Sequence, residues 1–107
     1  MTKPTKKSKT YYDWLECEDY IQKQHKCNIR DFKNKFKKIK GKLTVDDKKE
    51  YMDFWHWVLN NYEVHNGCFI TFTKEIYESI NEEWIKTIYG WFLEFADEGE
   101  VEFYVTW

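Results

Sequence analysis

The sequence predicts an α+β domain in which about four helices pack on a short two-stranded β element. Apolar residues recur at helical spacing in several segments, and residues 100–107 alternate between apolar and polar side chains as a half-buried strand does. The 107 residues fit one domain, with residues 1–10 as a mobile basic tail and residues 11–107 as a single globular unit.

Composition excludes several classes of protein. Only 4 Gly and 1 Pro, together with 21% aromatic residues, exclude collagen-like and generally disordered chains. No apolar run approaches the roughly 18 residues of a membrane span, and no signal-peptide pattern is present. The odd number of cysteines, 3, indicates free thiols in a reducing compartment, so we expect a cytoplasmic protein.

The first two predicted helices lie in the basic half of the chain. The first begins at Tyr11, with Thr10 as its cap, and ends near His25. The second begins at Asn28 and ends at Gly41. Opposite its apolar stripe, the second helix carries five lysines: Lys33, Lys35, Lys37, Lys38 and Lys40.

The second half of the chain alternates between helices and strands. A third helix is expected from Thr44 to Tyr62, followed by a turn, a strand over residues 68–73 and a short helical turn over residues 74–79. A capping box over residues 79–82 predicts the start of a fourth helix, which should be central because apolar groups cover most of it. Gly90 within this helix indicates close packing against another backbone.

The strand over residues 100–107 has the clearest alternation in the chain. Val101, Phe103, Val105 and Trp107 share one face. Two strands alone form a marginal sheet, and no Pro or Lys protects the edge of this one. We therefore expect a second copy, as in a homodimer, or a partner protein to complete the sheet.

Charge is divided between the two halves of the chain. Residues 1–45 have a balance of +8 and residues 46–107 a balance of −10, which together give the net charge of −2. This asymmetry indicates either an electrostatic partner for one half or mutual neutralisation, within one chain or between two copies. Of the 17 basic residues, Arg30 is the single arginine, and this skew toward A/T-rich codons weakens the case that the lysines were selected for nucleic acid.

Metal binding and catalysis have weak sequence support. His25 lies two residues before Cys27, and His65 three residues before Cys68, but no Cys-x-x-Cys pattern occurs. A Cys68 nucleophile would need His56 or His65 beside it in space, which spacing does not show. Free cysteines are usually small buried apolar residues. We expect no metal, no cofactor and no catalytic residue.

The aromatic residues provide the candidate binding site. Trp55 and Trp57 are separated by one helical residue and so point about 200° apart, which lets one enter the core while the other faces elsewhere. An exposed tryptophan often marks an interface, and the alternative is that both faces of this helix are buried. The partner-binding candidates are Trp55, Trp57, Tyr104 and Trp107. The electrostatic candidates are Lys33, Lys37, Lys38 and Lys40.

Three segments also carry a resemblance to a known group of proteins. Residues 53–57 (DFWHW), 65–67 (HNG) and 102–107 (EFYVTW) resemble small accessory proteins of tailed phages that have no assigned chemistry, over residues 51–107. The resemblance implies expression in the cytoplasm of an infected bacterium and a non-enzymatic binder that inhibits or modifies a host complex, such as an anti-defence factor of the anti-CRISPR type. The alternatives are a nucleic-acid-binding accessory protein using the lysine-rich half and a homo-oligomeric structural component.

Overall fold

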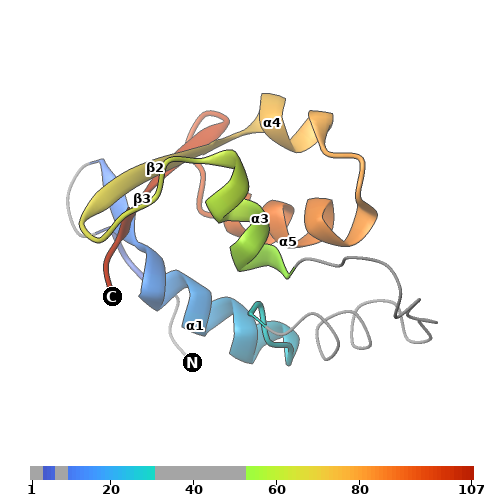
Figure 1. Ribbon diagram of the computed structural model, residues 1–107. Coiled ribbons are helices and arrows are strands. Elements are labelled where there is room, and N and C mark those ends of the chain that lie inside the picture. The colour runs from blue at the N-terminus through green and yellow to red at the C-terminus, as the bar shows by residue number, and fades with distance from the viewer. Residues whose placement is uncertain (1–3, 7–9, 31–52) are drawn as a thin grey trace.

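The structure is a computed structural model that describes residues 4–6, 10–30 and 53–107. Helices and a sheet share one core, which confirms the α+β class (Figure 1). None of the helices in these ranges is both long and apolar enough to cross a membrane. The elements in chain order are β1 (Tyr11–Asp13), α1 (Trp14–His25), α3 (Phe54–Asn61), β2 (Cys68–Thr73), α4 (Lys74–Ser79), α5 (Glu83–Leu93) and β3 (Glu100–Val105).

In the described part of the chain the sheet has three strands in the order β1-β3-β2, one more than predicted. β2 is antiparallel to β3, with Ile70 opposite Phe103, and β1 is parallel to β3, with Tyr12 opposite the same residue. The strand that was expected to be an unprotected edge is therefore central. The expectation that a second copy or a partner protein completes the sheet at this strand is wrong, because β1 already pairs with it.

The first helix begins three residues later than the sequence analysis placed it. Asp13, rather than Thr10, caps α1, because its carboxylate accepts a hydrogen bond from the backbone amide of Glu16 at 3.2 Å. Tyr11 to Asp13 form β1 instead of a first helical turn. A three-residue strand is too short for alternation to be visible, and its partner lies at the far end of the sequence.

Trp14 is the centre of the core. Its indole stacks on Phe92 of α5 with a centroid separation of 4.3 Å, and it contacts Phe72 of β2 and Phe103 of β3 edge-to-face at 5.7 and 5.4 Å. Phe54 of α3 stacks on Phe92 from 5.5 Å. The core therefore joins α1, α3, α5 and both long strands through aromatic side chains, which bury large areas in a small domain.

The third predicted helix is seen only in part. α3 begins at Phe54, because Asp53 is extended and its side chain accepts from the amide of His56 at 2.8 Å. The predicted start at Thr44 lies outside the described residues, as does the helix predicted over residues 28–41 beyond Arg30. Residue Ile29 is buried, and its carbonyl accepts from the amide of Phe54 at 3.2 Å.

The two helices that follow β2 lie where the sequence predicts them, but the capping and the close neighbour of α5 differ from the prediction. α4 confirms the short helical turn, and α5 is central as expected, with five buried residues. The predicted capping box is wrong, since α5 begins at Glu83 and the side chain of Glu82 makes no capping hydrogen bond. A Cβ at Gly90 would lie 3.1 Å from a ring carbon of Tyr77, so the close neighbour is a side chain and not another backbone.

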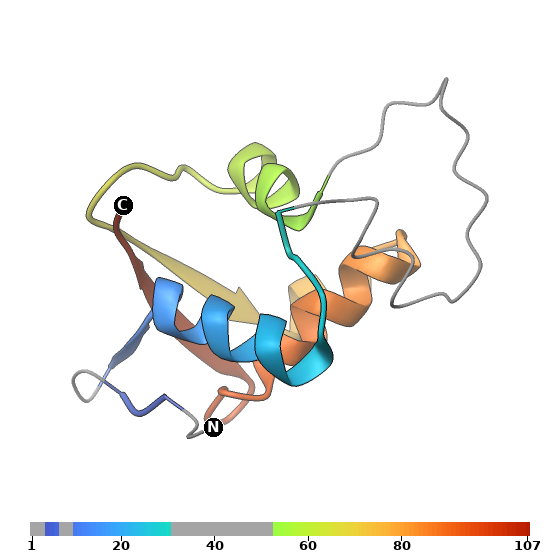
Figure 2. The ribbon, with the colours of Figure 1, turned by 90° about the horizontal axis from the view of Figure 1, so that it is seen from below.

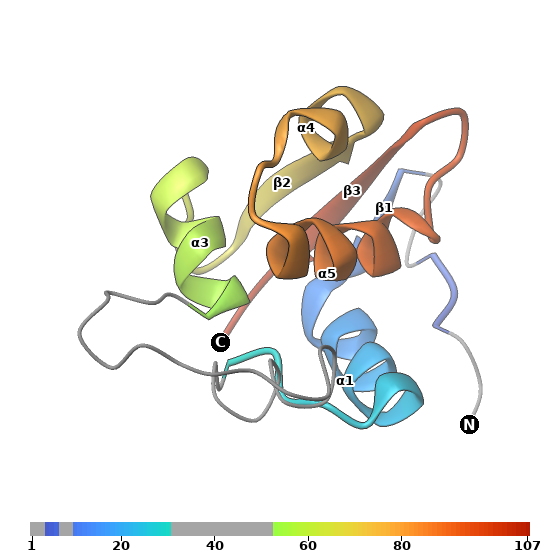
Figure 3. The ribbon, with the colours of Figure 1, turned by 90° about the vertical axis from the view of Figure 1, so that its right-hand side faces the viewer.

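The two faces of the sheet have different neighbours. α1, α3 and α5 all pack on the face that carries Phe72 and Phe103, and Figures 2 and 3 show α1 and α5 lying across the strands. The opposite face carries Tyr11, Phe69 and Tyr104, whose rings contact one another at centroid separations of 4.9–5.5 Å. Within the expected basic tail, the Nζ atom of Lys6 forms an ion pair with Oδ2 of Asp97 at 3.6 Å.

Two tyrosine hydroxyls satisfy backbone groups of β2. Tyr62 donates to the carbonyl of Thr71 at 3.1 Å, and Tyr89 accepts from the amide of Thr73 at 2.9 Å. The two hydroxyls lie 3.0 Å apart, so one donor chain runs from Thr73 through Tyr89 and Tyr62 to Thr71. Burial raises the pKa of both phenols, which keeps them neutral.

Candidate protein-binding surface

A buried carboxylate lies beneath the candidate surface. Glu18 is one turn after Trp14 on α1 and only 6% exposed. One of its oxygens accepts from the indole N–H of Trp14 at 3.3 Å and from Nε of Arg30 at 2.9 Å. Burial raises the pKa of Glu18, while the charge and hydrogen bond of Arg30 act in the opposite direction. Arg30 therefore compensates a charge that would otherwise be costly to bury.

Arg30 also contacts an aromatic ring. Its guanidinium carbon lies 4.2 Å from the ring centroid of Trp55, a cation–π arrangement. The ring of Trp55 also packs against that of Trp14, at a centroid separation of 5.7 Å. Since the side chain of Arg30 remains 39% exposed, the buried carboxylate fixes a cation that still reaches the surface.

Trp107 extends this cluster outward. Its backbone amide donates to Oδ1 of Asn66 at 3.0 Å, and its ring lies edge-on to Trp55 at 6.4 Å. The residue is nevertheless 65% exposed. We call Arg30, Trp55 and Trp107 the tryptophan surface: two indoles and a guanidinium in contact, held by Glu18 and Asn66.

The structure separates the four aromatic candidates into three places. Trp55 and Trp107 meet in the tryptophan surface. Trp57 packs elsewhere, against Phe54 and Tyr89 at 5.7 Å each, and Tyr104 lies on the sheet face opposite the core. The four lysine candidates, Lys33, Lys37, Lys38 and Lys40, lie outside the described residues.

Trp107 corrects one part of the strand prediction. The sequence placed it on the apolar face with Val101, Phe103 and Val105, and those three are buried as predicted. β3, however, ends at Val105, and Trp107 is exposed. Alternation applies only while the backbone remains paired, so it does not extend to a residue beyond the ladder.

Sequence reasoning did not select Arg30 and Glu18 for the site. The available signal was that Arg30 is the single arginine among 17 basic residues. Lys and Arg differ in chemistry, because the planar guanidinium can stack on an indole while donating to a carboxylate. Glu18 shares a helix face with Trp14, but its pairing with Arg30 required the tertiary fold.

The histidine–cysteine pairs have other surroundings. The His25 ring stacks on Trp91 with a centroid separation of 3.7 Å, and burial lowers the pKa of the imidazole. The backbone amide of His65, not its ring, donates to Sγ of Cys68 at 3.4 Å. In residues 4–6, 10–30 and 53–107, no group of three or more His, Cys, Asp or Glu could hold a metal ion.

Scans against family models, curated proteins and solved structures each found no match.

Proposed function

We propose that the chain is a non-enzymatic accessory protein of the phage type, which binds a host macromolecular complex and inhibits or modifies it through the tryptophan surface. The observation that carries this proposal is Trp107, a large side chain that is 65% exposed although its backbone is held by Asn66 and its ring by Trp55. Such a side chain loses little conformational freedom on binding. Tryptophan and arginine are also the residues most enriched among binding hot spots.

The charge of the second half of the chain favours a protein partner over nucleic acid. Residues 46–107 contain 4 Lys and Arg against 14 Asp and Glu, a balance of −10. A surface of this sign repels phosphate backbones and steers cationic partners toward it. We place the protein in the cytoplasm of an infected bacterium, and an anti-defence factor is one form of this function.

Affinity purification with paired variants tests the proposal. Tagged wild type, Trp107→Ala and Phe69→Ala are each expressed in bacterial cells, and co-purifying proteins are quantified against a tag control. Phe69 is a matched control because it is 48% exposed and lies on the sheet face opposite the core. We expect Trp107→Ala to reduce recovery of one host complex by at least about tenfold, as hot-spot truncations of about 1.4 kcal/mol or more do.

The remaining outcomes contradict the proposal. Equal recovery with Trp107→Ala and wild type would exclude this surface as the contact. Nucleic acid that co-purifies and is released by salt or by changing Lys33, Lys37, Lys38 and Lys40 to Gln would favour the nucleic-acid alternative. A large assembly of this chain alone would favour a structural component. Unchanged thermal unfolding of Trp107→Ala shows that the variant is folded.

A further inference from the structure

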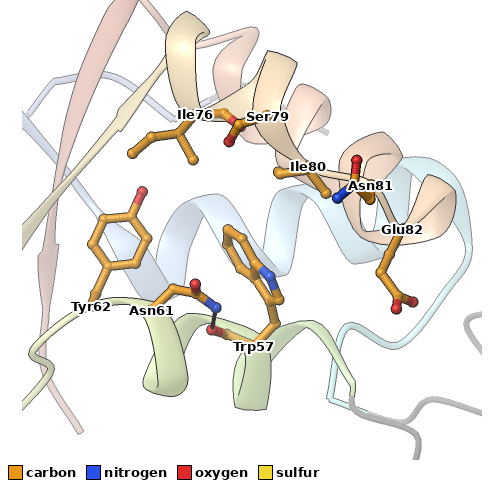
Figure 4. A pocket seen from close by; sticks show the side chains of 8 residues that line it. All are labelled: Trp57, Asn61, Tyr62, Ile76, Ser79, Ile80, Asn81 and Glu82. Carbon is orange, nitrogen blue, oxygen red and sulfur yellow. Dashed lines mark hydrogen bonds between the residues drawn. The ribbon is translucent and has the colours of Figure 1, made fainter.

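A pocket lies on the other side of α3 from Trp55. It is a pocket of about 470 Å³ between α3 and the segment that joins α4 to α5. Figure 4 shows the indole of Trp57 extending from α3 into this space, with Glu82 extending toward α3 from the opposite wall. The residues that line it include Trp57, Tyr62, Ile76, Ile80 and Glu82.

The pocket combines an apolar wall with an unused carboxylate. Trp57 and Tyr62 contribute two rings at a centroid separation of 6.3 Å and an interplanar angle of 71°, and Ile76 and Ile80 line the facing wall. Glu82 precedes α5 without capping it. Within the part of the chain that the structure describes, its carboxylate has neither a hydrogen-bond nor an ion-pair partner.

The same molecule shows what such a combination binds. At the tryptophan surface, an indole and a glutamate together hold the guanidinium of Arg30, with the cation over the ring of Trp55 and Nε on Glu18. The pocket beside Trp57 presents an indole and a glutamate again, but no cation of the described chain lines it. Lys86, a neighbouring cation, instead lies 5.0 Å above the ring of Tyr77.

The charge around the pocket favours a cationic ligand. The exposed residues of α4, of the segment after it and of the first turn of α5 include four glutamates, Glu75, Glu78, Glu82 and Glu83, and one lysine, Lys74. A cationic group is attracted to this region, whereas a carboxylate or phosphate is repelled. An arginine suits the pocket better than a lysine does. The face of its guanidinium can stack on an indole while the N–H groups in the plane of the guanidinium donate to a carboxylate.

We propose that this pocket binds the arginine side chain of a protein partner, with the guanidinium against Trp57 and paired with Glu82. The methylene stem of the arginine then packs on Ile76 and Ile80. This contact is separate from the tryptophan surface and does not require it, so either can fail without the other.

Nuclear magnetic resonance titration of the whole chain tests the site. The probe is N-acetyl-L-arginine amide, and its neutral control is N-acetyl-L-citrulline amide, which has nearly the same shape without the charge. The indole N–H signal of Trp57 is assigned by its loss in Trp57→Phe. We expect the arginine probe to shift this signal saturably in the millimolar range and the citrulline probe to bind at least about threefold more weakly.

Two variants link the binding to the carboxylate. Glu82→Gln keeps the shape of the side chain and should weaken binding of the arginine probe by about threefold to fivefold, as expected for a partly exposed ion pair. Glu78→Gln, on the neighbouring helix but outside the pocket lining, should leave the affinity unchanged.

Three results would overturn the inference. They are equal binding of arginine and citrulline probes, unchanged affinity in Glu82→Gln, and no shift of the Trp57 signal at high-millimolar probe. A shift confined to the signals of Trp55 and Trp107 belongs to the third case, because it places the probe at the other surface.

Discussion

Replacing Arg30 with methionine removes the cation that faces buried Glu18 while retaining an unbranched apolar stem against Trp55. The Nε–Oε2 distance is 2.9 Å, and the side chains of Arg30 and Glu18 are 39% and 8% exposed. A hydrogen bond to a charged group contributes about 1.5–3 kcal/mol, and partial solvation of the arginine reduces this value. We expect Arg30→Met to lower the free energy of unfolding by about 1–2 kcal/mol at neutral pH.

The loss should depend on pH in a defined direction. Burial raises the pKa of Glu18 above its ordinary value of 4.5, so the folded state holds this proton more tightly than the unfolded chain does. The resulting stabilisation is fully present below the unfolded pKa and is lost as pH rises through the folded pKa. Without Arg30, two influences that lower this pKa disappear and the folded pKa rises further. The free energies of unfolding of the variant and the wild type should therefore converge at about pH 4, where Glu18 is protonated in both.

Urea unfolding followed by tryptophan fluorescence at the two pH values measures both effects. Lys23→Met is the matched control, since Lys23 pairs with Asp19 at 3.2 Å on the exposed side of α1. We expect that control to change stability by less than about 0.5 kcal/mol. An equal loss for Arg30→Met at both pH values would contradict the prediction, because the cost would then come from the contact with Trp55 and not from the charge of Glu18.

Two other predictions concern tyrosine and histidine side chains. Tyr89→Phe and Tyr62→Phe should each lower the free energy of unfolding by about 1–3 kcal/mol, because each hydroxyl bonds one backbone group of β2 and the other hydroxyl. Urea unfolding of both variants and of the double variant checks this: the double variant should lose less than the sum of the two single losses, because each single variant already breaks the shared bond, and a strictly additive loss would contradict it. His25, stacked on Trp91, should titrate below its ordinary pKa of 6.5 in a nuclear magnetic resonance pH series, and Glu94→Gln should lower that pKa further because the Glu94 charge raises it. Stability from the neutral imidazole is present above 6.5 and is lost as pH falls through the lowered pKa; a rise of the His25 pKa in Glu94→Gln would exclude this account.

The two proposed contacts place different chemistry on opposite sides of α3. On one side, Trp55 supports Trp107 and a cation of the protein itself. On the other, Trp57 lines a pocket in which Glu82 has no cation from the described chain. The prediction that the two tryptophans point in different directions is confirmed, since they contact separate sets of residues.

Local periodicity explains which elements the sequence predicted well. Val101, Phe103 and Val105 are buried at every second position of β3, and the buried residues of α5 recur at helical spacing. These patterns are visible in sequence because burial of one face repeats with the geometry of the backbone itself.

The α+β class, the alternation of β3 and the apolar faces of α1 and α5 follow from sequence alone, because each depends on residues within one segment. The pairing of β1 with β3 does not, and it depends on the three-dimensional packing, which made the expected edge strand central. The packing also decided that Glu18 meets Arg30, that Trp55 meets Trp107, and that Glu82 faces the pocket of Trp57. Pairings between distant segments leave no periodic trace in sequence, since they are set by how the aromatic core packs the elements together.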